Sequence, residues 1–130
     1  MAISEPHVGT DALGMKTMAQ KHSQGYVLNG RKMWITNGTL DDQGTPGDCV
    51  LVYAKSGIKD GKPQISTFLV ERGHKGYSVG QKIKDKLGMR ASNTAELVFQ
   101  DCIVPAENLV GHEGEALTHM MRNLEIERLT

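Results

Sequence analysis

The sequence is poor in cysteine and aromatic residues, and neither sign of charge is in excess. Among 130 residues there are two cysteines and 5% aromatic residues, and 15 Lys and Arg balance 15 Asp and Glu. A net charge of zero argues against nucleic acid or an anionic membrane as the main partner, because both usually select a basic surplus. No apolar run approaches membrane-spanning length. The length suits one domain with a hydrophobic core.

Patterns for metal binding, nucleophilic catalysis and phosphate binding are also missing. Cys49 and Cys102 lack metal-ligand spacing, and each lies in an apolar run, which predicts two small buried thiols in a reducing compartment. No Ser-His-Asp or Cys-His arrangement stands out, and no dinucleotide fingerprint is present. We therefore predict no metal site. The histidines, interpreted as structural or surface residues, are His7, His22, His74, His112 and His119.

The most informative stretch is NGRKMWITNG at residues 29–38, which holds the only tryptophan. Both central residues of a type I′ turn need positive φ, so the first Asn-Gly pair predicts a β-hairpin. Strand alternation would then place Lys32, Trp34 and Thr36 on one face. Two interpretations of Trp34 and Thr36 remain open: a half-buried sheet surface, or an indole and a hydroxyl suited to a flat polar ring system.

The rest of the chain predicts a mainly β fold that ends in a helix. Fifteen glycines and few aromatic residues are typical of a turn-rich β-domain. Seven or eight short antiparallel strands would be buried most economically in a two-sheet sandwich or a flattened barrel. The predicted strands lie at 15–20, 26–28, 31–36, 49–55, 65–71, 77–79, 95–100 and 103–104, with loops at 39–48, 56–63 and 82–94.

From about residue 113 the apolar period becomes helical. Leu117, Met120, Met121, Leu124 and Arg128 fall at i, i+3, i+4, i+7 and i+11, so one face of the helix is mainly apolar. The pattern stops inside the helix without a C-cap signal, which we interpret as a piece of a longer protein. At the edge of that face, Glu127 either pairs with Arg128 or is solvated, or it faces an apolar pocket as a proton acceptor.

Four motifs in order resemble the acyl-CoA dehydrogenase family. Residues 1–11 resemble its SEPxAGSD segment, and residues 29–38 resemble its NGxKxWITNG segment. Residues 86–94, KLGMRASNT, resemble KLGMRxSxT, and residues 99–111 resemble the exit from the family's β-domain. Together the motifs cover nearly the whole chain.

The resemblance implies two domains and a flavin site. Residues 1–111 would form the middle β-domain, and residues 112–130 would be the truncated first helix of the C-terminal helical domain. In the family, FAD lies between these two domains. The FAD contacts carry over to Met1, Ile3, Ser4, Trp34, Ile35 and Thr36, with Trp34 near the isoalloxazine and the hydroxyls of Ser4 and Thr36 on its polar edge.

The helix resembles the isovaleryl-CoA dehydrogenase branch, in which the catalytic base comes from this element. Glu127 matches that base, and Glu125, Ile126 and Arg128 match its pocket neighbours. Thr10 stands where the family has a serine that contacts substrate. This chain departs from the branch just before the motif, where Arg122 and Asn123 replace a small Ser-Gly pair.

The resemblance implies dehydrogenation of an acyl-CoA thioester to a trans-2-enoyl-CoA, with a short branched or medium acyl chain such as isovaleryl. It also implies electron-transferring flavoprotein as the electron acceptor, a homotetrameric parent, and a mitochondrial matrix or bacterial cytoplasmic location. Half of the flavin site would lie in missing segments, so we expect this chain alone to be inactive. The alternatives are an acyl-CoA oxidase and a non-catalytic β-sandwich binding module.

Overall fold

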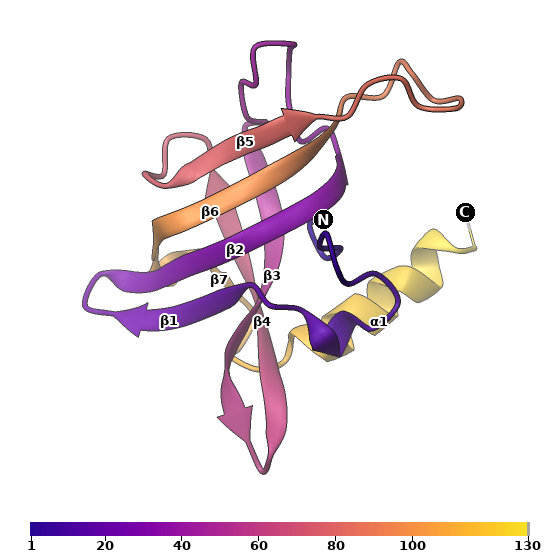
Figure 1. Ribbon diagram of the computed structural model, residues 1–130. Helices are drawn as coiled ribbons and strands as arrows, with labels where there is room; N and C mark the ends of the chain where they lie inside the picture. Colours follow the sequence, from indigo (N-terminus) through magenta and orange to yellow (C-terminus); the bar gives the residue numbers. More distant parts are fainter. Residues whose placement is uncertain (130) are drawn as a thin grey trace.

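The computed structural model describes residues 1–129 and consists mainly of strands with one α-helix near the C-terminus (Figure 1). This confirms the predicted mainly β class. The strands are β1 (Met18–His22), β2 (Gly25–Thr36), β3 (Cys49–Lys59), β4 (Lys62–Glu71), β5 (Tyr77–Lys82), β6 (Thr94–Pro105) and β7 (Leu109–Val110), and the helix is α1 (Ala116–Glu127). Short 3-10 helices occupy Ala12–Gly14 and Ala106–Asn108.

All seven strands belong to one sheet, in the order β5-β6-β2-β1-β3-β4-β7. The predicted pair of antiparallel sheets is therefore replaced by one mixed sheet, because β1 pairs parallel with β3 at Met18 and Lys55. Within the described residues the sheet does not close into a barrel. Figure 1 shows β5, β6, β2 and β1 crossing in front of β3 and β4.

The hydrophobic core lies between these two halves of the sheet. Tyr26 on β2 packs against Phe68 on β4 with ring centroids 4.9 Å apart, although the two strands are not neighbours in the sheet. Leu28, Val52 and Leu97 are fully buried in the same cluster. The bent sheet thus buries apolar side chains as a sandwich would, because its two halves face each other.

The predicted hairpin at Asn29-Gly30 is wrong, because β2 runs straight through this pair. The pair instead lies opposite a bulge in β6: Leu28 pairs with Cys102 and Gly30 with Phe99, so β6 has one extra residue there. The Asn29 amide bonds to Asp101 twice: its Oδ1 accepts from the Asp101 N–H at 2.8 Å, and its Nδ2 donates to the carboxylate at 3.1 Å. The predicted strands 95–100 and 103–104 likewise form one strand, β6.

A tight hairpin with an Asp-Gly turn lies elsewhere, inside the predicted loop 56–63. Strands β3 and β4 continue through that segment and turn at Asp60 and Gly61, whose φ angles are 50° and 73°. These angles are those of a type I′ turn, which Asp-Gly favours. The loop prediction is wrong because the register of β3 and β4 only shifts between Lys55 and Gly57, and the pairing then resumes as far as Lys59 and Lys62.

Alanine substitution at two glycines distinguishes the effect of a close packing contact on stability from the effect of a positive φ angle. A Cβ on Gly30 would lie 2.7 Å from the Cα of Thr17, whereas a Cβ on Gly61 would meet no atom within 4 Å. Both residues have positive φ. We expect Gly30→Ala to lower the free energy of unfolding by about 3 kcal/mol and Gly61→Ala by about 1 kcal/mol. Urea denaturation measures both, and equal losses would contradict the role of the Thr17 contact.

Only one of the two cysteines is buried as predicted. Cys102 is fully buried, and burial raises the pKa of its thiol to about 11. Cys49, in contrast, is exposed, because it is the first residue of β3 and lies where the core ends. Both cysteines are free.

Candidate functional site

The site begins at an irregularity in β2. Lys32 pairs with Leu97 and Ile35 pairs with Ala95, so three residues of β2 advance while β6 advances by two. Trp34, in this bulge, has a φ of 65° and is 61% exposed. The predicted alternation is therefore wrong here: Lys32 is buried in the core together with Ile35, while Trp34 points to solvent.

The N-terminal segment lies directly beside this bulge. The Ala2 N–H donates to the carbonyl of Leu51, so the segment runs along β3. Two residues later, the carbonyl of Ser4 accepts a hydrogen bond of 2.9 Å from the Met33 N–H. Ser4 and Trp34, which are thirty positions apart in the sequence, are therefore separated by one backbone hydrogen bond and one residue.

A buried ion pair joins the same two segments. Lys32 Nζ lies 2.9 Å from Glu5 Oε1 and donates at 3.0 Å to the carbonyl of Ile3. The Glu5 carboxylate also accepts from the Thr17 hydroxyl at 2.6 Å, the Thr17 N–H at 3.0 Å and the Lys16 N–H at 2.6 Å. Four hydrogen bonds thus converge on one carboxylate, as a buried charge requires.

The pKa values of this pair follow from burial and hydrogen bonding. Burial alone would raise the pKa of Glu5, but hydrogen bonds from Thr17, the Lys16 N–H and Lys32 hold it below its ordinary value. Burial also lowers the pKa of Lys32, although the carboxylate of Glu5 opposes this effect. Sequence analysis missed both residues.

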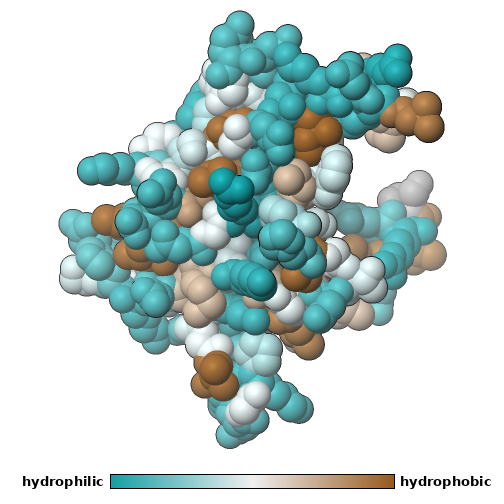
Figure 2. Space-filling model, in the orientation of Figure 1, coloured by the Kyte–Doolittle hydropathy of each residue, from teal (hydrophilic) through white to brown (hydrophobic). Residues whose placement is uncertain are grey.

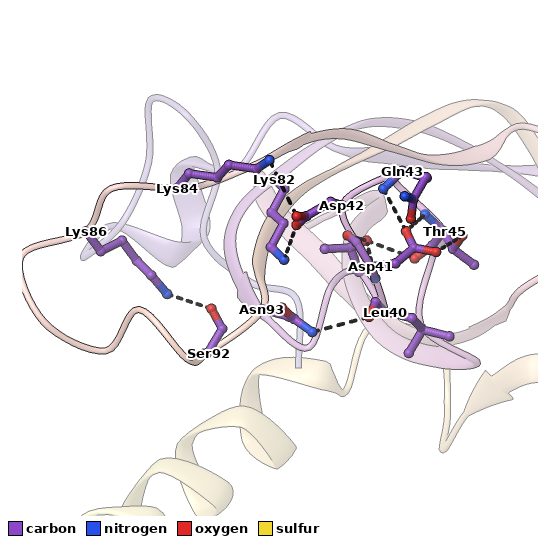
Figure 3. A network of polar contacts seen from close by, with 11 residues as sticks. Leu40, Asp41, Asp42, Gln43, Thr45, Lys82, Lys84, Lys86, Ser92 and Asn93 are labelled. Atoms are coloured by element: carbon purple, nitrogen blue, oxygen red, sulfur yellow. Dashed lines mark hydrogen bonds and ion pairs between the residues drawn. The ribbon is translucent and has the colours of Figure 1, made fainter.

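Two loops enclose the end of β2 that carries Thr36. Residues 37–48 follow β2, and residues 83–93 precede β6, where Thr94 pairs with Thr36. Figure 3 shows polar contacts that tie these loops together: Lys82 Nζ and Lys84 Nζ lie 2.6 Å and 3.8 Å from the carboxylate of Asp42. The Thr36 side chain is exposed beside them.

Space-filling contours show a notch between the 83–93 loop and the C-terminal end of α1 (Figure 2). The projecting loop carries Leu87 and Met89 fully or largely exposed. The loop and the end of α1 thus lie on either side of one hollow in the surface.

The helix and the N-terminal segment form a groove of about 700 Å³. The helix contributes Leu117, Met121 and Arg128, which belong to the predicted apolar face. The opposite wall contains Ile3, Ser4 and Thr10. Four of the predicted site residues, Ile3, Ser4, Thr10 and Arg128, thus line one groove.

The other predicted residues lie around this groove. Glu125, Ile126 and Glu127 are exposed in the last turns of α1. Ile35 is buried, so it can meet a ligand only through its backbone. Met1 lies where α1 crosses β3, with its Sδ 3.7 Å from the Tyr53 hydroxyl and 3.8 Å from Asn123 Nδ2.

Glu127 affects the pKa of Tyr53, a buried residue whose hydroxyl contacts Met1. Burial raises the pKa of Tyr53, and the negative charge of Glu127 makes a smaller contribution in the same direction. Tyr53 also lines a cavity of about 360 Å³ with Asn123 and Arg122, the two residues that depart from the family pattern. Glu127 follows Asn123 by four residues, so both lie on the same side of α1, and Asn123 contacts Met1 there.

Among residues 1–129, no group of three or more His, Cys, Asp and Glu side chains could hold a metal ion. Two of the histidines make local backbone contacts: the Nδ1 atoms of His22 and His74 accept from the N–H groups of Gln24 and Glu71. In the same part of the chain, α1 is too short and too polar to cross a membrane as a helix.

Comparison with known proteins identifies the family. The profile described as "Acyl-CoA dehydrogenase, middle domain" matches residues 1–102. Mitochondrial isovaleryl-CoA dehydrogenase of Arabidopsis thaliana is 46% identical over 99% of this chain, which spans 30% of that relative. An acyl-CoA dehydrogenase structure from Geobacillus kaustophilus superimposes with a TM-score of 0.88 at 39% identity, over 98% of this chain and 32% of the other.

A second similar structure is a complex with FAD. The acyl-CoA dehydrogenase from Bacillus anthracis, complexed with FAD, superimposes with a TM-score of 0.83 at 39% identity, over 98% of this chain and 21% of that one. The profile match covers well over half of the chain, and it spans both the N-terminal segment and the β2 bulge. The chain therefore belongs to the acyl-CoA dehydrogenase family, and residues 1–102 correspond to its middle domain.

Proposed function

We propose that this chain is part of a flavin-dependent acyl-CoA dehydrogenase. Residues 1–111 would be its middle β-domain, and residues 112–130 would begin its C-terminal helical domain. The chain spans about a third of the length of its relatives, so the complete active site needs further segments. The observation that carries the proposal is the exposed indole of Trp34, held in a backbone bulge beside Ser4.

The residues present fit a flavin. Among the described residues, the side-chain hydroxyls of Ser4 and Thr36 make no hydrogen bond, so both are available to the polar edge of a ring system. An exposed indole offers an apolar face of the right size for an isoalloxazine. FAD would be held by Met1, Ile3, Ser4, Trp34, Ile35 and Thr36. When bound, it supplies the acceptor for the hydride that leaves the β-carbon of the substrate.

The groove between α1 and the N-terminal segment suits the acyl-CoA substrate. Thr10 supplies a hydroxyl, Arg128 a positive charge, and the helix face an apolar wall. Glu127 would remove the α-proton of the thioester, with Glu125 and Ile126 as its neighbours. An α-proton is only weakly acidic, so the remaining domains must exclude water and supply donors to the thioester oxygen.

The wider biology follows from the same assignment. A short branched or medium acyl-CoA such as isovaleryl-CoA would be the substrate, and electron-transferring flavoprotein the electron acceptor. The parent would be a homotetramer. A location in the mitochondrial matrix or in a bacterial cytoplasm agrees with a mitochondrial plant relative and two bacterial structures.

The test is steady-state turnover of the full-length parent across a series of acyl-CoA thioesters, with FAD content measured in parallel. We expect a yellow protein that reduces an artificial electron acceptor with C4 to C6 branched or straight acyl-CoA, about 10³-fold or more above the protein-free rate. Oxygen consumption at the same rate would identify an oxidase instead. A colourless parent that FAD cannot reconstitute would contradict the proposal and favour a non-catalytic module.

A further inference from the structure

The Glu5–Lys32 pair is a buried polar feature that the proposed chemistry does not use. Lys32 is completely buried, and Glu5 is nearly so. Burying an ion pair removes both ions from water, and well-packed apolar residues of similar volume often stabilise a fold equally well or better. Stability alone therefore does not account for the pair, and its place in the fold is more informative.

The ammonium group of Lys32 contacts the residues on both sides of Ser4. Its Nζ lies 3.0 Å from the carbonyl oxygen of Ile3 and 2.9 Å from Glu5 Oε1. The next residue of β2, Met33, donates its N–H to the Ser4 carbonyl at 2.9 Å. Three consecutive residues of the N-terminal segment are thus bound to two consecutive residues of β2.

The carboxylate of Glu5 extends this attachment to a third segment. Its hydrogen bonds from Lys16 and Thr17 hold the residues that precede β1. Thr17 in turn lies against Gly30, two residues before Lys32. The pair therefore joins the N-terminal segment, the approach to β1 and the middle of β2 around one buried charge.

Trp34 follows this attachment directly, and the pairing with β6 resumes only at Ile35. Its side chain is 61% exposed, and its positive φ is costly for a residue other than glycine. Such a conformation persists only where the surrounding structure over-determines it. Because the Lys32–Met33 backbone is bound to residues 3–5, the bulge cannot relax without breaking contacts to the buried charge.

We propose that the Glu5–Lys32 pair is a positioning device, which holds Ser4 and the Trp34 bulge in a fixed mutual geometry before any ligand binds. The identity of the ligand as FAD rests on the proposed function, whereas the geometry does not. A site ordered in advance binds more tightly, because the ligand does not have to order the chain. Glu5 and Lys32 are thus positioning residues, and they need not touch the ligand.

The test uses the 130-residue chain with both charges removed, Glu5→Gln/Lys32→Met. We expect cooperative unfolding to persist while the ¹⁵N order parameter of the Trp34 amide falls from about 0.85 to below about 0.6. The matched control is Asp48→Asn/Arg72→Met, which removes an exposed ion pair between the residue before β3 and the residue after β4 and should leave Trp34 rigid. A rigid Trp34 in the folded double variant would overturn the proposal.

A milder variant covers the case in which the double variant does not fold. Thr17→Val removes the 2.6 Å hydrogen bond to Glu5 with little change of shape, and it should lower the Trp34 order parameter by a smaller amount. No change in Trp34 would count against the pair. In the full-length parent, the double variant should weaken FAD binding at least about tenfold. A mobile Trp34 with unchanged FAD affinity would support the positioning role but contradict FAD as its ligand.

Discussion

Replacing Glu127 with glutamine in the full-length parent is expected to lower kcat by at least about 10²-fold while FAD remains bound. Glutamine keeps the shape of the side chain and its exposure in the last turn of α1, but it cannot accept the α-proton of a thioester. Substrate binding should change little, because the groove is lined by other residues of α1. Steady-state kinetics with the preferred acyl-CoA, and the flavin absorbance of the purified variant, measure the two effects.

The matched control is Glu115→Gln. This carboxylate is also exposed, but it belongs to the N-cap residue of α1, at the opposite end of the helix from Glu127. Its loss should change kcat by less than about threefold. If Glu127→Gln turned over normally, the base would lie in a segment outside this chain. Equal losses in both variants would indicate a general effect of charge on the helix.

Removing only one partner of the Glu5–Lys32 pair is expected to cost about 3–5 kcal/mol of unfolding free energy. Lys32→Met leaves the carboxylate of Glu5 buried without its counter-ion, and the hydrogen bonds from Thr17 and Lys16 do not replace the lost charge. The double variant Glu5→Gln/Lys32→Met should cost much less, because no uncompensated charge remains. Urea denaturation of the three proteins gives this comparison, and additive losses would contradict it.

The same pair predicts the direction of the pH dependence. The pKa of Glu5 in the folded chain lies below its ordinary value of 4.5, so the unfolded chain binds this proton more readily. The stabilisation is thus complete above pH 4.5 and is lost as the pH falls through the folded pKa. The pKa of Lys32 is also lowered, below 10.5, so its contribution likewise rises with pH in that alkaline range. The double variant should lose part of the acid slope, because Asp41 and Asp42 also have lowered pKa values and keep their share. An unchanged slope would assign all of it to carboxylates other than Glu5.

Local sequence patterns predicted element types better than they predicted connections. The apolar run at residues 49–55 became the interior strand β3, and the helical period after residue 113 became α1. These patterns succeed because each records which face of one element is buried. The Asn29-Gly30 turn failed because a turn preference is weak beside the pairing of β2 with β1 on one side and β6 on the other.

The residues of the candidate site were likewise predictable only in part. Motif order pointed to Ser4, Thr10, Trp34 and Arg128, and three of these four line one groove. No pattern indicated the Trp34 bulge, because it arises from the register between β2 and β6. The burial of Lys32 was equally invisible, since its partner Glu5 lies 27 positions away.

Periodicity and short motifs are local properties of the chain, and they were enough to predict the mainly β class, the C-terminal helix and the family. The single bent mixed sheet, the exposure of Cys49 and the burial of Lys32 are visible only in the folded chain. These outcomes depend on which distant segments pack together. The charge of Glu5, the contact of Gly30 with Thr17 and the bulge at Trp34 acquire their roles only where those segments meet.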